Sequence, residues 1–312
     1  MPPACRRGVD PPPPAVREGA DTLLMLPTWT PRRSAVHLLP SFAPLTESPL
    51  AFRFELSVHA EGQWSGWAAT ATLGAAEFAP LPAAAPPLTC DVDVFRAAST
   101  VDALRLRVRI RGDASPRWMA ALSAADATSG DMRVPDGAVA RLRVPALSQR
   151  EADPTLGPRI CSPTSVAMVL GYWGRTVAPT SLAAEMYHPA LDIYGVWPAA
   201  VRAAAARGLA GYLLRFPDWG AARWCLERGI PIVTSVRYTV GELTDAAIDA
   251  TPGHLLVVNG IDGDAVLVND PAAPTAAAVC RRYRADEFAR VWLARGGVGY
   301  VLFDPARVSS GA

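Results

Sequence analysis

A cysteine stands at the start of a predicted helix in the segment RICSPTSVAMVLGYWG, residues 159–174. Pro163 suits the first turn of that helix, because its missing N–H would have no partner there. An apolar stripe follows at helical spacing, formed by Val166, Val169, Leu170 and Trp173. Free N–H groups and the helix dipole stabilise a thiolate at such a position. Cys161 is therefore a candidate nucleophile, although an arbitrary cysteine is more often buried for packing alone.

A nucleophilic thiol needs a base, and His254 is the candidate. It opens the predicted strand HLLVVNGI, after which the turn DGD leads into AVLVND. A hairpin centred on residue 262 would make His254 and Asp270 cross-strand neighbours, with Cβ atoms about 5 Å apart. A carboxylate on one ring nitrogen would fix the tautomer and direct the other nitrogen at the thiol. Taken singly, a surface histidine and an aspartate in an Asp-Pro turn are the more ordinary interpretations.

Asn269 is a second candidate for the residue that orients the base. Alternation along the strand places its side chain on the opposite face from that of Asp270. Asp270 is therefore preferred for this role.

The second half of the chain carries the elements that must position these residues. Helical spacing predicts helices over 163–173, 180–187, 197–207, 219–228 and 285–295. Strand-like runs cover 230–236, 254–261, 265–270 and 298–303. Gly208 and Gly229 follow two of the helices, where a left-handed residue commonly ends a helix. Leading helices and later strands predict an α+β domain over residues 145–312.

From residue 50 to residue 144 the apolar residues recur with a period of two. The segments AFRFELSVH (51–59) and LRLRVRIR (104–111) alternate strictly, and QWSGWAATATL (63–73) and AVARLRV (138–144) are further candidate strands. Such alternation is typical of antiparallel strands with one solvated face. With Pro-rich connections between the strands, it predicts an all-β sandwich domain over residues 22–144. A flexible Pro-rich tail is expected before it, over residues 1–21.

Two features of this first half could bind a ligand. One strand face gathers four basic side chains, which could hold an anion: Arg105, Arg107, Arg109 and Arg111. A solvated sheet face is the preferred interpretation of that row. Trp64 and Trp67 could stack on a sugar, although aromatic residues in strands more often pack in a core or at its rim. A glycan or protein ligand of the β-sandwich is kept as an expectation.

The composition of the whole chain argues against several function classes. A formal net charge of +1 over 312 residues gives no electrostatic argument for a nucleic-acid or anionic-membrane partner. The five cysteines and four histidines are scattered, so neither a disulfide framework nor a metal site is predicted, and no cofactor is implied. No apolar run reaches the ~18 residues of a membrane span. The N-terminus lacks the apolar core of a secretion signal, which predicts a cytoplasmic protein; a misassigned start codon would leave an extracytoplasmic one as the alternative.

Four stretches taken in order share the pattern of one enzyme family: LSQREADPTLGPRICSPTSVAMVLGYWG, YGVWPAAVRAAAARGL, GHLLVVNGIDGDAVLVNDPA and FARVWLARGGVGYVLFDP. They span nearly all of residues 147–305, and they resemble the papain-superfamily cysteine peptidases related to the bacterial double-glycine leader peptidases. The resemblance implies a papain-like domain over residues 145–312, with Cys161 as nucleophile, His254 as base and Asp270 as orienting carboxylate.

The resemblance also implies roles for residues near the thiol. Gln149 matches the glutamine that helps to bind the oxyanion, where a side-chain amide and the backbone N–H of Cys161 would share the developing charge. Ser162, Gly195 and Trp197 match residues at the substrate cleft, and a core role for Trp197 is equally open. Two departures stand out. Ser162 replaces the usual glycine, and Gln149 precedes Cys161 by 12 residues, a longer gap than is typical of the leader peptidases.

The combined expectation is a cysteine hydrolase that cleaves a peptide or amide bond of a peptide or protein substrate through a thioester. One alternative is a binding protein without enzymatic activity, in which a papain-like groove accompanies the β-sandwich. Another is an acyltransferase that uses the same three residues. The sequence does not indicate an oligomeric state.

Overall fold

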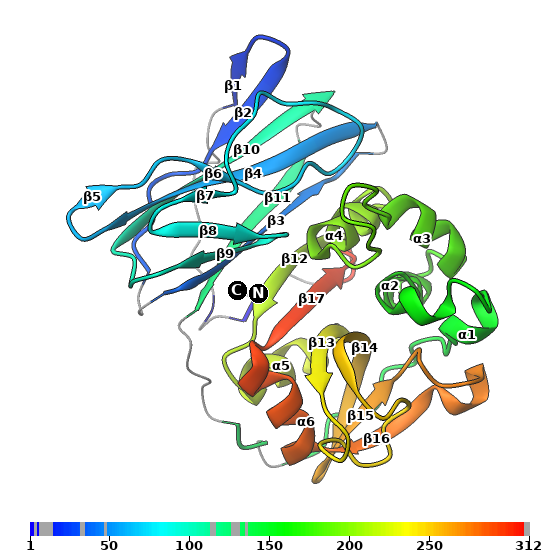
Figure 1. Ribbon diagram of the computed structural model, residues 1–312. Coiled ribbons are helices and arrows are strands. Elements are labelled where there is room, and N and C mark those ends of the chain that lie inside the picture. Colours follow the sequence, from blue (N-terminus) through cyan, green and yellow to red (C-terminus); the bar gives the residue numbers. More distant parts are fainter. Residues whose placement is uncertain are drawn as a thin grey trace.

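The computed structural model describes residues 1–2, 5, 15–31, 35–46, 49–112, 117–125, 132–134 and 137–308. Within these residues the strands form three sheets, two in the N-terminal half and one in the C-terminal half. Figure 1 shows the first two sheets beside the third sheet and its helices. The N-terminal half is thus built from strands, and the C-terminal half combines helices with a sheet.

The first N-terminal sheet has the strand order β1-β2-β10-β4-β5, and β6 also pairs with β4. Its strands are β1 (Ala15–Glu18), β2 (Asp21–Met25), β10 (Ala103–Gly112), β4 (Leu50–Ala60), β5 (Gln63–Trp64) and β6 (Ala68–Ala69). The second sheet consists of β11 (Trp118–Ala125), β3 (His37–Pro44), β9 (Val94–Ala97), β8 (Leu88–Asp91) and β7 (Ala84–Ala85). Phe42 of β3 and Phe52 of β4 meet edge to face with ring centroids 5.2 Å apart, so apolar side chains join the two sheets.

The expected tail over residues 1–21 needs correction where the structure describes it. Residues 3–4 and 6–14 lie outside the described residues, but residues 15–18 form β1, which pairs with β2. All four side chains of β1 are exposed. Backbone pairing therefore holds this strand, and no apolar pattern could have predicted it.

The segment 138–144, predicted as a strand of the N-terminal half, lies instead against the C-terminal sheet. Val139 bridges Ile261, and the N–H of Leu142 donates to the carbonyl of Asn259 at 2.7 Å. Alternation identifies a strand with one buried face, but it does not specify which sheet that strand joins.

The arginine row of β10 is ion-paired rather than simply solvated, which corrects the preferred interpretation. Glu55 of β4 is completely buried and accepts hydrogen bonds from Arg53 and Arg109, each at 2.8 Å, and from Arg107. The guanidinium of Arg105 lies 3.5 Å from the ring centroid of Trp64. Arg107 lies in the same way over Trp67, and Asp21 pairs with Arg109 and Arg111. One face of each of these two indole rings is thus occupied within the chain.

The C-terminal sheet is antiparallel, with the order β12-β17-β13-β14-β15-β16. Its strands are β12 (Ala210–Arg215), β17 (Val298–Phe303), β13 (Ile232–Tyr238), β14 (Thr251–Asp262), β15 (Ala265–Asn269) and β16 (Cys280–Arg284). The five predicted helices are confirmed as α2 (Cys161–Tyr172), α3 (Pro179–Met186), α4 (Trp197–Ala205), α5 (Trp219–Glu227) and α6 (Ala285–Val291). Short helical turns were not predicted: α1 (Gln149–Ala152), η2 (Gly157–Arg159), η3 (Ala276–Ala278) and η4 (Leu293–Arg295). Strands β12 and β16 were not predicted either.

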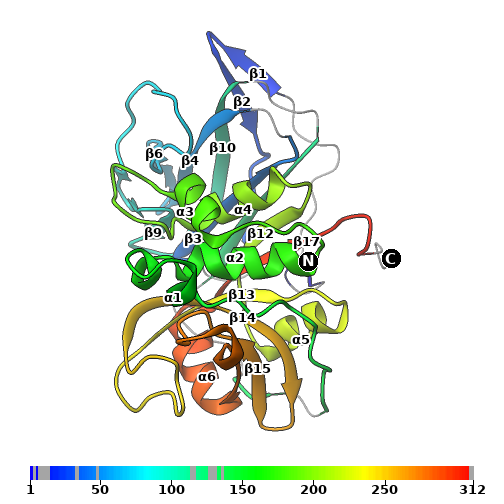
Figure 2. The same ribbon diagram turned by 90° about the vertical axis from the view of Figure 1, so that its right-hand side faces the viewer.

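Helices lie on both sides of this sheet. Helix α2 packs against β14, whereas α5 and α6 contact strands of the same sheet from the other side (Figure 1). Figure 2 shows α2 in the middle of the molecule, between α3 and α4 on one side and β13 and β14 on the other. Gly208 and Gly229 have φ of 78° and 70°, as predicted for residues that end α4 and α5.

The hairpin β14–β15 forms, but the predicted register is wrong. Its turn is the pair Gly263–Asp264, not a turn centred on residue 262, and a β-bulge then adds one residue to β14. Val257 is consequently opposite Asn269, so His254 lies two residues away from the position opposite Asp270. The two are diagonal neighbours, a separation that long side chains can span.

The N-terminal and C-terminal halves share one apolar core. Strand β12 is at the edge of its sheet, and its N–H groups at Leu213 and Arg215 donate to the hydroxyls of Ser41 (3.1 Å) and Ser123 (2.9 Å). These serines belong to β3 and β11 of the N-terminal half. The edge of the C-terminal sheet is thus covered by the other half of the chain, which removes unpaired backbone donors from its surface.

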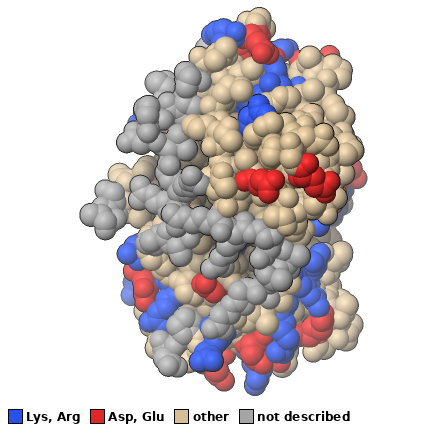
Figure 3. Space-filling model, turned by 90° about the vertical axis from the view of Figure 1, so that its left-hand side faces the viewer, with Lys and Arg blue, Asp and Glu red and all other residues tan. Residues whose placement is uncertain are grey.

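Charged side chains are mixed rather than segregated on the face drawn in Figure 3, where acidic and basic groups intermingle over the lower part. This mixing agrees with the formal net charge of +1. Among the described residues, no helix is long and apolar enough to cross a membrane.

Candidate active site

Helix α2 begins at Cys161, as the sequence predicted. The preceding residue, Ile160, has no side chain that could cap the helix, so the first N–H groups are not satisfied by a cap. The residues from Ser162 to Leu170 are all buried, whereas Cys161 is only partly buried. Cys161 therefore combines a position at the free N–H groups of a helix start with partial exposure of the residue.

His254 of β14 lies between the thiol and a carboxylate. Its Nε2 donates to Asp270 Oδ1 at 2.7 Å, and the side chain of His254 also hydrogen-bonds Cys161. Because Nε2 is occupied by Asp270, Nδ1 is the ring nitrogen that faces the sulfur. Both His254 and Asp270 are almost inaccessible to solvent.

Asp270 follows β15 directly, and donors surround its carboxylate. Oδ1 accepts from His254 and from the N–H of Ala272 at 3.0 Å, and Oδ2 accepts from the hydroxyl of Tyr283 at 2.7 Å. A carboxylate held by three donors has little freedom to rotate. It therefore fixes the plane of the imidazole as well as its tautomer.

The electrostatics favour a thiolate beside an imidazolium. Burial opposes ionisation of Cys161, but the hydrogen bond and charge of His254, with the N–H groups of Leu255 and Ser162, lower the pKa of the thiol. Burial also opposes protonation of His254, but the Asp270 carboxylate, aided by Cys161, raises the pKa of the ring. The pKa of Asp270 is lowered despite burial, chiefly by the charge of His254. These opposite pKa shifts favour the form in which the shared proton is on His254 and Cys161 is a thiolate.

Gln149 begins the short helix α1 and is buried. Its N–H donates to the carbonyl of Pro271 at 2.9 Å, which ties α1 to the residue after Asp270. Its side-chain oxygen, also buried, has no hydrogen-bond partner within the described residues. The structure thus brings the backbone of Gln149 to the Asp270–Pro271 segment and leaves part of its amide without a partner.

The residues predicted at the cleft have different surroundings. Ser162 is buried, and its hydroxyl lies 3.2 Å from that of Tyr300 on β17, so it faces the interior. Gly195 is partly exposed, with open space where a Cβ would be. Trp197 is partly buried against the core, and its N–H donates to Asp93.

Asn269 does not contact His254. Its amide nitrogen donates to the carbonyls of Val144 and Pro145, and its oxygen accepts from Asn259. It thus anchors the segment that connects the two halves, on the opposite strand face, as alternation predicted.

Three further cysteines, Cys90, Cys225 and Cys280, have surroundings unlike those of Cys161. Burial raises the pKa of Cys90 and of Cys225 to about 12. Cys280 is exposed, and its thiol donates to Asn269 rather than lying beside a histidine.

Sequence reasoning missed Tyr283, the third donor to Asp270. It lies on β16, which carries the segment CRRYR and was not predicted as a strand. This short basic segment has no apolar pattern that would predict a strand, so the sequence gives no local sign that Tyr283 would donate to Asp270.

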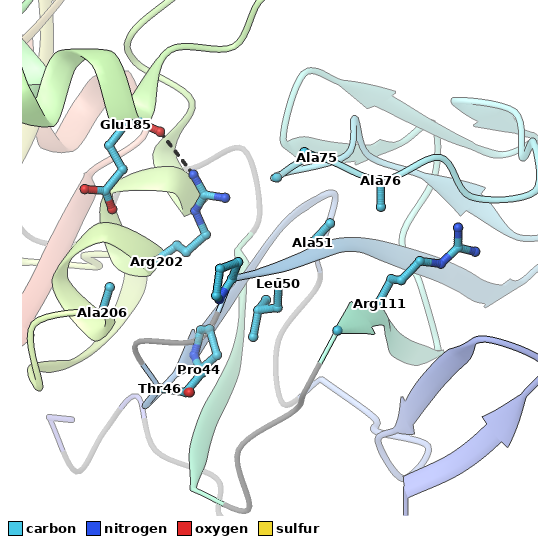
Figure 4. A pocket seen from close by; sticks show the side chains of 13 residues that line it. Pro44, Thr46, Leu50, Ala51, Ala75, Ala76, Arg111, Glu185, Arg202 and Ala206 are labelled. Carbon is cyan, nitrogen blue, oxygen red and sulfur yellow. Dashed lines mark hydrogen bonds between the residues drawn. The ribbon is translucent and has the colours of Figure 1, made fainter.

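A separate pocket of about 450 Å³ opens between the N-terminal sheets and α3 and α4 (Figure 4). Leu50 and Ala51 line one side, and Glu185 and Arg202 line the other, where Arg202 donates to the Glu185 carbonyl at 3.1 Å. The described residues that line it include no cysteine and no histidine. It therefore offers no nucleophile and base of the kind found around Cys161.

Residues 141–300, just over half of the chain, match the Peptidase_C39 like family. No curated protein matches the chain.

Three solved structures are similar to about half of it. A C39-like peptidase from Bacillus anthracis is 19% identical, with 54% of this chain and 98% of that chain covered and a TM-score of 0.41. A double-glycine motif protease from an AMS/PCAT transporter, in complex with a leader peptide, is 21% identical, with 55% and 96% covered and a TM-score of 0.34. The peptidase domain of a bifunctional Streptococcus ABC transporter involved in quorum sensing is 16% identical, with 47% and 92% covered and a TM-score of 0.33.

Proposed function

Because the chain belongs to the Peptidase_C39 like family, we propose that it is a cysteine peptidase in which Cys161, His254 and Asp270 act as a catalytic triad. The observation that carries this proposal is the position of His254, hydrogen-bonded to Asp270 at 2.7 Å on one side and to the Cys161 thiol on the other. This order of candidate nucleophile, base and orienting group supports the proposal, because acyl transfer uses such an arrangement.

In the first half of the reaction, the Cys161 thiolate attacks the carbonyl carbon of a peptide bond and the carbonyl oxygen becomes an oxyanion. The backbone N–H of Cys161 and the side-chain amide of Gln149 are the proposed donors to that oxygen. The C–N bond then breaks as the imidazolium of His254 gives its proton to the leaving amine. This leaves a thioester on Cys161 and a neutral imidazole.

In the second half, His254 takes a proton from water as the water oxygen attacks the thioester carbonyl. The C–S bond breaks, the acid leaves, and the thiolate–imidazolium pair is restored. Asp270 stabilises the imidazolium in both halves and stays ionised throughout. With an amine in place of water the same residues would transfer the acyl group, so the product distinguishes the two reactions.

We assign this chemistry to residues 145–312, as a papain-like domain with its substrate cleft near Gly195 and Trp197. Ser162, whose buried hydroxyl faces Tyr300, is not assigned to the cleft. The two N-terminal sheets, over residues 22–144, are assigned as a β-sandwich. Its proposed ligand is a glycan or a protein, and one face of each of the Trp64 and Trp67 rings is already covered by an arginine.

Selective alkylation tests the proposal. We expect iodoacetamide near pH 6 to label Cys161 before any other cysteine, because His254 lowers the pKa of this thiol and the residue is partly exposed. The adducts are mapped by mass spectrometry, with Cys161→Ala as the control. Peptide-library cleavage then tests the reaction itself. Labelling of Cys225 or Cys280 first would contradict the assignment of the nucleophile.

A further inference from the structure

Residues 192–197 form the last part of the connection from α3 to α4, together with the first residue of α4. This segment is fixed at both ends, and we call it the wall segment. At its first end, Arg159 Nη2 lies 2.9 Å from Asp192 Oδ1, and the Arg159 guanidinium lies 5.2 Å from the ring centroid of Tyr194. Arg159 is in η2, immediately before the residues that begin α2. This end of the wall segment is therefore held next to the chain that carries Cys161.

The other end is held by the N-terminal half of the molecule. The N–H of Trp197, the first residue of α4, donates to Asp93 Oδ2 at 2.7 Å. Val196, at the N-cap position, supplies no side-chain hydrogen bond, so Asp93 takes the place of a local cap. A carboxylate at this position is also favoured by the dipole of the helix.

The turn that presents Asp93 is strained. It connects β8 to β9, and Val92 at its centre has φ of 58°. The N–H of Asp93 donates to the carbonyl of Asp91 at 2.8 Å, which makes this a γ-turn with positive φ, a rare conformation. A β-branched residue strongly disfavours such a φ. Strain of this kind persists only where surrounding contacts impose it, and it gathers at functional sites.

Asp93 is also costly to bury. It is 5% exposed, and burial raises the pKa of its carboxyl to about 7. Asp91 raises that pKa further, whereas the Trp197 N–H lowers it. A buried carboxyl of this kind is more readily explained by a role at a site than by stability.

Asp93 and Cys161 are linked through Tyr300 of β17. Burial raises the pKa of Tyr300, and the charges of Asp93 and Cys161 both raise it further, so both groups are within electrostatic range of this one phenol. The Tyr300 hydroxyl in turn lies 3.2 Å from that of Ser162, the residue after Cys161. The N-terminal half thus reaches the surroundings of Cys161 through the β8–β9 turn.

We propose that Asp93 is a positioning residue that holds the wall segment against the path of a bound peptide, so that the N-terminal sheets complete the substrate cleft. This inference rests on the proposed peptidase function. A peptide backbone would run between the wall segment and Cys161, and release of the Trp197 N–H would let the wall segment move. Misplacement of a bound substrate by about 1 Å costs up to ~100-fold in rate, so loss of the Asp93 contact should strongly slow the reaction of a peptide. The intrinsic reactivity of the thiol should change little.

Two alkylating probes separate these effects. Iodoacetamide is small and reports the thiolate, whereas acetyl-Gly-Gly chloromethyl ketone must lie along the cleft without any side chain that could clash. For each probe, the second-order rate constant with Cys161 is divided by the rate constant with N-acetylcysteine, which removes the probe's own reactivity. The value for the chloromethyl ketone is then divided by the value for iodoacetamide. This ratio measures how much the cleft contributes to the reaction. The variants are Asp93→Ala and Asp93→Asn, with Asp91→Ala as an exposed control in the same turn.

We expect Asp93→Ala to lower the ratio about 10-fold while the rate with iodoacetamide changes less than about 2-fold. Asp93→Asn should restore most of the ratio, because an amide oxygen can still accept the Trp197 N–H, and Asp91→Ala should leave it unchanged. Should Asp93→Ala fail to fold, Val92→Gly serves in its place: glycine tolerates the positive φ, and the loosened turn should lower the ratio about 3-fold.

An unchanged ratio in a folded Asp93→Ala or Val92→Gly variant would overturn the inference. So would a wild-type ratio near one, because the cleft would then contribute nothing. In both cases selective labelling of Cys161 by iodoacetamide would still support the peptidase proposal, whereas loss of that selectivity in the wild-type protein would contradict the proposed function itself.

Discussion

Two clusters of buried charge lie in the two halves of this molecule, and they differ in what remains reactive. Around Glu55 in the N-terminal half, a fully buried carboxylate is surrounded by guanidinium groups, with Trp64 and Trp67 stacked on neighbouring arginines. Around His254 in the C-terminal half, a buried carboxylate and a buried imidazole lead to Cys161, which is partly exposed. Both clusters shift pKa values, so a shifted pKa alone does not distinguish them.

The difference lies in the proton and in access to solvent. Arginine does not release its proton near neutral pH, so the Glu55 cluster can only neutralise charge. The His254 cluster shares a proton between a thiol and an imidazole, and its nucleophile can be reached. Of these two clusters, the one whose buried charge activates an accessible thiol indicates chemistry, and the one whose buried charges only neutralise each other indicates structure.

The largest effect should come from removing the reachable nucleophile. Cys161→Ala is expected to lower peptide cleavage by ~10⁴-fold or more, because no other residue of the triad can form the thioester. Little volume is lost at this partly exposed position, so the urea unfolding midpoint should change little. Cleavage rates and unfolding curves of the same preparation measure both. Substantial residual cleavage would mean that the reaction does not pass through this thiol.

The opposite behaviour is expected at Glu55. Glu55→Gln should reduce the free energy of unfolding by about 3–5 kcal/mol, since it leaves buried arginines without their counter-charge. The rate of Cys161 alkylation in the folded protein should stay as it is. The exposed Glu77→Gln is the matched control. Urea unfolding measures the loss, and an effect below about 1 kcal/mol would show that the other acidic groups of the cluster suffice.

The pH dependence of stability sharpens the same comparison. Burial opposes ionisation of Glu55, but its arginine neighbours, Arg109 first, lower its pKa in the folded state. The stabilisation from its charge is therefore present above the ordinary glutamate pKa and is lost as the pH falls toward the lower folded value. The free energy of unfolding of the wild-type protein should therefore fall on acidification. In Glu55→Gln it should fall less steeply between pH 5 and about pH 3.

An intermediate effect is expected at Asp270. Asp270→Asn preserves shape and removes the charge, so kcat/KM should fall by ~10–10³-fold, less than in a serine triad because a thiolate needs less help from its base. His254→Ala should cost more, and the double variant should lose much less than the product of the two, since both act on one ring. Strictly multiplicative losses would show that the two residues do not work together.

The smallest effect should come from Tyr283→Phe. It removes one of three donors to Asp270, so kcat/KM should fall by about 2- to 10-fold while the other two donors keep the carboxylate in place. The alkylation rate against pH is the second measurement: a freer carboxylate should stabilise the imidazolium less well, and the onset of thiolate reactivity should shift upward. An unchanged profile would restrict Tyr283 to packing.

Local sequence patterns predicted most of what is local in the structure. The start of α2 at Cys161 followed from Pro163 and the apolar spacing, and β4 and β10 followed from strict alternation. The arrangement of His254 and Asp270 was predicted through a register that proved wrong by two residues. The two still meet because they lie on one face of a twisted hairpin, where a diagonal neighbour is within reach.

The sequence by itself determined the five longer helices and the most regular strands, such as β4 and β10, together with the position of the thiol on its helix. Those properties depend on periodicity and on residues close along the chain. Only the tertiary structure decided that Tyr283 holds Asp270, that the arginine face is neutralised by Glu55 and Asp21, and that Asp93 caps α4. Each of these contacts joins residues far apart in sequence or on different strands, and an alternating or helical pattern specifies a buried face without specifying the partner that covers it.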